Sequence, residues 1–320
     1  YSRYTPLLYL KDQVKYAKQL TAQRNMGGFM KGILIKRLES SFFAFSKTLG
    51  RFIESYEKFI EMAKTGKVYI SKKVNVYDLL DDGNINKLLY YIEQEDVMAF
   101  ETSDFQPKLL KDLESDLAEL KYLRDLWSMI KVDPKLAMFK HELQNNNHIY
   151  GHKIIVFTES TETAEYLYNN LTDIYGKKVV CFSGQSSRTL KVEIEDSFNP
   201  KNKAKENDKY DLLITTDVLA EGVNLHRANV LVNYDLPWNP TRIMQRVGRI
   251  NRVGTEFDRI YVFNFFPTAQ SAKHMPLEDR ILEKLQAFHD TLGEDIKYLS
   301  DDEEVSPQKL FSDLNKDIDC

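Results

Sequence analysis

The sequence predicts an α/β fold, a parallel sheet flanked by helices, preceded by an all-helical N-terminal region. Up to about His148, apolar residues recur at helical spacing, with few runs of β-branched residues. From Gly151 to about Pro267, short strands rich in Val and Ile alternate with amphipathic helical segments. A length of 320 residues accommodates two domains. We therefore expect a helical accessory domain at 1–148, an α/β domain at 149–298 and an acidic tail at 299–320.

Two apolar stripes define the expected helical region, and both have the three- and four-residue spacing of one helix face. The first ends at Thr65-Gly66, a plausible helix stop. The stripes are Leu38, Phe42, Phe45, Leu49, Phe52, Tyr56 and Phe59, and Leu110, Leu113, Leu117, Leu120, Leu123, Trp127 and Ile130. Such helices most simply pack as an antiparallel hairpin. The acidic stretch between them, 78–104, favours a loop with a short solvated helix; a regulatory flap or partner surface is the alternative.

Five candidate strands follow, each short and continuously apolar. They are KIIVFT from Lys153, KVVCFS from Lys178, YDLLIT from Tyr210, NVLVNY from Asn229 and RIYVFNFF from Arg259. The helical segments TETAEYLYNNLTDI and TLKVEIEDSF lie between strands, so right-handed crossovers and a doubly wound sheet are expected. Ligands in such sheets gather at the carboxyl ends of the strands.

Net charge, cysteine content and the lengths of the apolar stretches limit the classes of function that the sequence allows. The net charge of −4 gives no whole-chain basic signature, so nucleic-acid binding would need a local patch. Cys181 and Cys320 form no metal or disulfide pattern, which fits a reducing, cytoplasmic location, and Cys181 reads as a small core residue. No stretch approaches the roughly 18 apolar residues that span a bilayer, so no membrane partner is expected. The opening YSRYTPLLYL lacks signal-peptide features and reads as the start of an excised piece of a longer chain.

Two segments carry the chemistry: TTDVLAEGVNL at 215–225 and QRVGRINR at 245–252. Each comes after a predicted strand, and Asn239-Pro240 is a natural helix opening before the second. Arg246, Arg249 and Arg252 are spaced by three, so on a helix they share one face, beside Arg242 and Gln245. Planar, permanently charged guanidinium groups match the transition state of a transferring γ-phosphoryl group. A solvated basic helix with ordinary salt bridges is the alternative.

These segments resemble motifs V and VI of superfamily 2 helicases. The run VLVNYDLPWNPTRIMQRVGRINRVG is most similar to the Swi/Snf-like branch, which includes the bacterial RNA-polymerase-associated translocase. KIIVFTEST resembles motif IV and CFSGQSS the loop after the next strand, so the resemblance covers roughly Asp133 to Pro267. It implies the second, RecA-like lobe of a P-loop NTPase type motor. In the helical region, SSFFAFSKTL resembles uncharacterised bacterial helicase-domain proteins.

The resemblance also implies residue roles. Arg249 and Arg252 would be arginine fingers, and Arg246 and Gln245 would bridge to the partner lobe's acidic motif and phosphates. Gly222 and Asn224 would approach the nucleotide's ribose and phosphates. The phosphate backbone of the nucleic acid would be touched by Thr158, Ser160, Ser183, Gly184 and Thr216, which suits contacts that position a strand without reading bases. Glu221 departs from the family pattern and receives no role.

No GxxxxGK[ST] loop and no strand-linked Asp-Glu pair for Mg²⁺ occurs in the sequence. The family places both on a first lobe, so ATP with Mg²⁺ would be bound mainly by that absent lobe of the same parent chain, and this fragment alone would be inactive. The resulting prediction is the motor lobe of an ATP-dependent translocase or helicase, with duplex DNA favoured over RNA. The alternative is a non-catalytic scaffold in which the RecA-like lobe and the helical hairpin bind a protein partner.

Overall fold

The computed structural model describes residues 1–71, 97–199, 208–220, 223–237, 241–251 and 259–266, together with Asn239 and Phe257. The chain divides into two compact units, Tyr1–Asp133 and Pro134–Cys320. This division falls before the boundary expected at 148, because the helix from Pro134 packs on the sheet of the second unit. The acidic tail expected at 299–320 lies outside the described residues.

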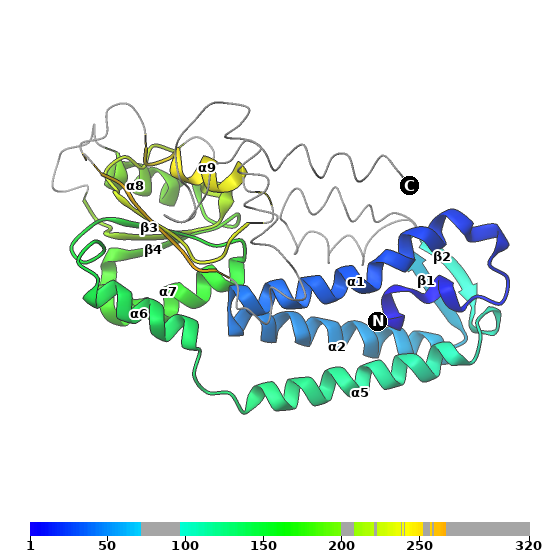
Figure 1. The fold of residues 1–320 in the computed structure, drawn as a ribbon. Helices are drawn as coiled ribbons and strands as arrows, with labels where there is room; N and C mark the ends of the chain where they lie inside the picture. The colour runs from blue at the N-terminus through cyan, green and yellow to red at the C-terminus, as the bar shows by residue number, and fades with distance from the viewer. Residues whose placement is uncertain are drawn as a thin grey trace, which may run out of the picture. The chain divides into compact units, whose positions relative to one another are not determined.

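Helices dominate the first unit (Figure 1). Three short 3₁₀ helices, η1 (Ser2–Tyr4), η2 (Pro6–Tyr9) and η3 (Val14–Tyr16), lead into α1 (Ala17–Ser40) and α2 (Phe42–Lys64). Strands β1 (Lys67–Ser71) and β2 (Val97–Glu101) form an antiparallel pair, and η4 (Thr102–Asp104) precedes α5 (Lys108–Ser128). The expected loop or solvated helix is therefore wrong for 97–101, which is a strand, while 78–96 lies outside the described residues.

Helices α2 and α5 form the expected antiparallel hairpin. The rings of Phe42 and Phe45, at the start of α2, each lie 4.6 Å from the ring of Trp127 near the end of α5. At the other end, Lys64 Nζ lies 2.7 Å from Glu114 Oε1. The hairpin prediction is confirmed by these opposed contacts.

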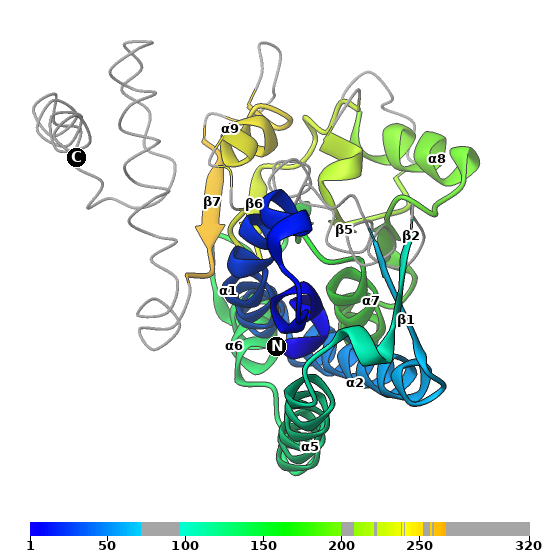
Figure 2. The same ribbon diagram turned by 90° about the vertical axis from the view of Figure 1, so that its right-hand side faces the viewer.

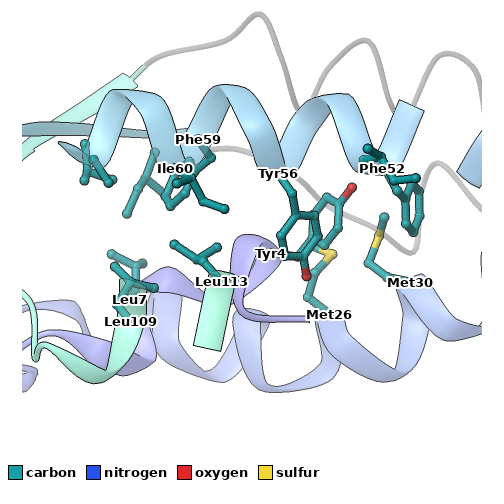
Figure 3. Packing of buried hydrophobic residues seen from close by; sticks show 14 of the residues in the cluster. Tyr4, Leu7, Met26, Met30, Phe52, Tyr56, Phe59, Ile60, Leu109 and Leu113 are labelled. Carbon is teal, nitrogen blue, oxygen red and sulfur yellow. The ribbon is translucent and has the colours of Figure 1, made fainter. Parts of the chain in front are cut away.

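The helical conformation is interrupted at Ser41, so the apolar stripe predicted from Leu38 to Phe59 does not belong to one helix. Ser41 is extended, and its Oγ accepts a hydrogen bond from the backbone N–H of Ala44 at 3.0 Å. This N-cap starts α2 and leaves Leu38 on α1. Helix α1 is a third long helix, and its Met26 and Met30 pack against the aromatic face of α2 in one core with Leu109 and Leu113 of α5 (Figure 3).

The second unit is a five-stranded parallel sheet, as predicted. Its strands are β3 (Ile154–Phe157), β4 (Val179–Phe182), β5 (Leu212–Thr215), β6 (Val230–Asn233) and β7 (Tyr261–Asn264), in the order β4-β5-β3-β6-β7. Figure 2 labels β7, β6 and β5 from left to right. Its helices are α6 (Pro134–Asn145), α7 (Thr161–Tyr175), α8 (Arg188–Phe198) and α9 (Thr241–Val247), with the 3₁₀ turns η5 (Gly176–Lys178) and η7 (Asp217–Ala220).

Alternate strand residues face two separate cores, which explains the continuously apolar strands. Ile154 and Val156 pack with apolar residues of α6 and α7, whereas Ile155 and Phe157 pack with residues of α8 and α9. Figure 1 shows these helix pairs on opposite sides of the strands. The α6 residues in this core are Leu136, Phe139 and Leu143, which is why the unit begins at Pro134.

In the part of the chain that the structure describes, no helix has the length and hydropathy of a membrane span.

Candidate functional site

The loops that follow the strands of the second unit meet at the carboxyl edge of its sheet. Because all five strands are parallel, their carboxyl ends share that edge. There the loops after β3, β5 and β6 bring together Thr158, Asp217 and Asp235, while α9 adds its arginines. The two segments predicted to carry the chemistry, 215–225 and 245–252, therefore both have residues at this edge.

Arg246 of α9 is the anchor of this edge. Its side chain is fully buried. Its Nε and Nη2 donate to the two carboxylate oxygens of Asp217 at 2.6 and 3.0 Å. Its Nη1 donates to Asn233 Oδ1 at 2.9 Å and to the backbone oxygen of Asp235 at 3.2 Å. Burial alone would lower the pKa of Arg246, but the Asp217 carboxylate outweighs it and raises the pKa above its ordinary value, so the guanidinium stays charged.

This geometry ties Arg246 to its own lobe. The four acceptor atoms belong to Asp217 in η7, Asn233 of β6 and Asp235 just after β6, so none of these bonds points outward. The expected bridge from Arg246 to a partner lobe's acidic motif is therefore replaced by an internal ion pair with Asp217. Asp217 also accepts from Nη1 of the half-buried Arg242 at 3.2 Å.

Helix α9 ends before the second arginine. Asn239 Oδ1 accepts from the backbone N–H of Thr241 at 3.1 Å at its start, as the Asn-Pro opening predicts. The helix assignment stops at Val247, and Arg249 lies in the following turn, where its N–H donates to the Arg246 carbonyl at 3.1 Å. The expectation of one helix carrying all three arginines on one face is thus wrong for Arg249, and Arg252 lies outside the described residues.

Arg249 differs from Arg246 in its partners. Its side chain is partly exposed, and its buried Nε has no hydrogen-bond partner among the described residues. Gln245 is exposed on α9, and Asn224 is exposed beyond η7. Gly222 lies outside the described residues. The structure therefore leaves Arg249 and Gln245 accessible and commits Arg246 to the interior.

The hydroxyl groups expected to meet a nucleic-acid strand mostly face inward. Thr158 is fully buried and donates to Asp235 Oδ2 at 2.6 Å. Ser160 caps α7, since its Oγ accepts from the backbone N–H of Thr163 at 3.2 Å. Ser183 and Thr216 are also buried, and the Thr216 Oγ1 atom is covered. These side chains hold the loops in shape, so a strand at this edge would meet backbone groups and exposed positions such as Gly184.

Sequence reasoning missed the two acidic residues that organise this edge. Asp217 follows β5 directly after Thr216, and Asp235 follows β6 by two residues. Asp235 Oδ1 also accepts from the backbone N–H of Glu159 at 2.7 Å, which joins the loops after β3 and β6. An acidic residue just beyond each buried strand was the available signal, because a carboxylate there needs a nearby donor.

The described residues contain no group of three or more His, Cys, Asp or Glu side chains that could hold a metal ion.

Residues 134–254 match the model of the helicase conserved C-terminal domain. The uncharacterized ATP-dependent helicase YqhH of Bacillus subtilis (strain 168) is 38% identical over 146 residues, 44% of this chain and 23% of YqhH. The CHD3-type chromatin-remodeling factor CHR7 of Arabidopsis thaliana is 22% identical over 268 residues, 80% of this chain and 20% of CHR7. A solved structure of S. cerevisiae Dbp5 bound to RNA and ADP BeF3 has a TM-score of 0.36 and 23% identity, covering 46% of this chain and 36% of that one.

The matched region is less than a quarter of the length of either curated relative. The order of the motifs, the parallel sheet and the family model agree within the second unit. Within it, residues 134–254 are similar to the helicase conserved C-terminal domain, and the similar proteins include an ATP-dependent helicase and a chromatin-remodeling factor.

Proposed function

We propose that this lobe is the C-terminal motor lobe of an ATP-dependent translocase or helicase that acts on duplex DNA. A first lobe in the same parent protein would bind most of the nucleotide, and this lobe would supply arginine fingers. ATP hydrolysis would then require closure of the two lobes, and opening after hydrolysis would move the protein along the nucleic acid.

The observation that carries this proposal is the contrast between Arg246 and Arg249. The ion pair of Arg246 with Asp217 fixes the end of α9, and the backbone of Arg249 hydrogen-bonds to that end. Among the described residues, the Arg249 side chain forms no ion pair with a carboxylate, and its Nε is buried without a hydrogen-bond partner. A charged donor held rigidly without an acceptor fits an anion such as a γ-phosphoryl group.

The residues present fit the phosphates of ATP better than they fit its metal. Arg249, Arg252 and Gln245 would approach the γ-phosphate, with Gly222 and Asn224 beside the ribose. Mg²⁺ would be held by the first lobe together with the phosphates. Bound there, it would neutralise charge that develops on the β- and γ-phosphate oxygens.

Nucleic acid would lie along the loops after β3, β4 and β5. Exposed backbone at Gly184 and the amino end of the eleven-residue helix α8 offer N–H donors to phosphates. Such contacts read no bases, so binding should weaken steeply with salt. The chromatin-remodeling name of CHR7 supports duplex DNA, and the Swi/Snf-like run of residues 230–254 favours the same choice.

The test is steady-state ATP hydrolysis by the full-length parent protein with duplex DNA, single-stranded DNA, RNA or no nucleic acid. We expect strong stimulation by duplex DNA and a loss of about 10³-fold or more in kcat for Arg249→Ala, the size of an arginine-finger effect. Arg124→Ala, which removes an exposed arginine of α5 in the other unit, is the matched control and should leave kcat unchanged.

Absence of stimulation by every nucleic acid would contradict the motor proposal. Full activity of Arg249→Ala would contradict the finger assignment while leaving the family unchanged. Stimulation of ATP hydrolysis by RNA alone would support the motor proposal but would identify RNA, not duplex DNA, as the substrate.

One observation favours a second candidate, a protein-binding scaffold. Helix α5 exposes Tyr122 and Leu126, and its C-cap residue Met129 is exposed at the spacing of the same helix face. A scaffold would need this face and not the arginines. Retention of the parent's cellular function by Arg249→Ala, with its loss in Tyr122→Ser/Leu126→Ser, would favour the scaffold.

A further inference from the structure

Helix α5 has two apolar faces, and the core of the first unit covers one of them. The covered face carries Leu109, Leu113, Leu117, Leu120, Leu123 and Trp127. On the outward side, Tyr122 is 62% exposed and Leu126 is 40% exposed. Met129 and Ile130, which directly follow the helix, are 65% and 49% exposed. These four residues form an apolar surface, the outer patch, that the described residues leave uncovered.

The outer patch lies on an ordered turn of the chain. The backbone N–H groups of Met129 and Ile130 donate to the carbonyls of Leu126 and Trp127 at 3.2 and 3.1 Å, so the turn continues past the last residue of α5. Tyr122, Leu126 and Met129 are separated by four and three residues, which places them on one helix face. The outer patch is therefore a ridge about 12 Å long.

Opposite charges lie at the two ends of the outer patch. The exposed Glu119 comes three residues before Tyr122, and the exposed Lys131 comes directly after Ile130. Lys131 Nζ donates to the Ser128 carbonyl at 2.8 Å, which holds the ammonium group at its end of the patch. The Glu119 carboxylate forms no ion pair among the described residues.

We propose that the outer patch docks a second copy of this chain, packed antiparallel about a two-fold axis at Leu126. In this arrangement Leu126 meets the partner's Leu126, and Tyr122 meets the partner's Met129. Residues at equal distances from the axis face one another, so Glu119 of each copy meets Lys131 of the other. The patch is thus complementary to itself in both shape and charge, as a two-fold interface requires.

The charges select this direction of packing. A parallel pair would bring Glu119 against Glu119 and Lys131 against Lys131, and both contacts would be repulsive. The antiparallel pair replaces them with two attractive contacts at the rim of an apolar centre, which is the usual composition of a specific interface.

The contact is small, so the dimer should be weak. About two turns from each copy, with the residues that follow, would bury roughly 1,000 Å² in total, which is less than a standard stable interface of about 1,600 Å². We therefore expect a dissociation constant of roughly 10–100 µM. The contact uses no residue of the carboxyl edge of the sheet, so this inference does not depend on the proposed function.

The test is sedimentation velocity of the full-length parent protein over a range of concentrations, where we expect a reversible monomer–dimer equilibrium. Leu126→Glu places two carboxylates against each other at the axis and should raise the dissociation constant more than about tenfold. The Leu126 side chain faces away from the core, so the fold should persist. Ser46→Glu adds the same charge at an exposed position of α2 and is the matched control, which should dimerise like the wild type.

Charge reversal tests the direction of packing. Glu119→Lys alone should raise the dissociation constant about three- to tenfold, because two lysines would then meet at each end of the patch. Adding Lys131→Glu to the same chain should restore the wild-type value, since each end regains opposite charges. A protein that stays monomeric throughout, a dimer that Leu126→Glu leaves intact, or a double variant that is not restored would each overturn the proposal. None of these results would contradict the motor proposal, which the ATP hydrolysis assay tests separately.

Discussion

Replacing Arg246 by Met should destabilise the second unit strongly, although the new side chain has similar length. The substitution removes four hydrogen bonds, of 2.6 to 3.2 Å, from a fully buried guanidinium. Asn233 is itself fully buried, so its Oδ1 would lose its donor. Breaking a buried ion pair typically costs about 3–5 kcal/mol.

The lower part of that range applies here. The Asp217 side chain is 20% exposed and keeps the 3.2 Å contact from Arg242, so its charge is not left alone. We therefore expect a loss of about 3 kcal/mol for Arg246→Met. Arg242→Met breaks the partly exposed contact with Asp217 and should cost less than about 1 kcal/mol.

The assay is urea unfolding followed by circular dichroism, with hydrogen exchange of peptides from β5 and β6 to assign the loss to this unit. A double-mutant cycle with Asp217→Asn should give a coupling of about 2 kcal/mol, since the two side chains share two hydrogen bonds. A loss below 1 kcal/mol with no coupling would refute the assignment of Arg246 as an internal anchor.

Two further predictions follow from titrating groups of the same unit. Partial burial alone would raise the pKa of Asp208, but Lys153 and Arg227 outweigh it and lower the pKa below its ordinary value. Asp208→Asn should therefore lower the free energy of unfolding by about 1 kcal/mol at pH 7. This difference is present above the unfolded pKa near 4 and is lost as pH falls through the folded pKa, so an equal difference at pH 7 and pH 2 in urea titrations would contradict the prediction. Burial raises the pKa of Cys181 to about 12, so only about one thiol in 10⁴ is ionised at pH 8. Mass spectrometry should therefore find Cys181 unlabelled by iodoacetamide in the folded protein and labelled in urea. Rapid labelling of the folded protein would contradict the burial of this thiol.

The sequence by itself determined the sheet and the order of its functional segments. Each buried strand is a local run of apolar residues, and a run covered on both faces has no polar alternation to obscure it. The segments at 215–225 and 245–252 were recognisable because their residues are contiguous. The α2–α5 hairpin was predictable for the same reason, since each stripe repeats at helical spacing.

Only the tertiary structure decided which polar groups face inward. The partner of Arg246 lies 29 residues earlier in the chain, and that of Thr158 lies 77 residues later. Helical spacing puts arginines on one face but does not say that one of them meets a carboxylate from another strand. Buried charge requires such a partner, and pairing distant residues is the work of the folded sheet.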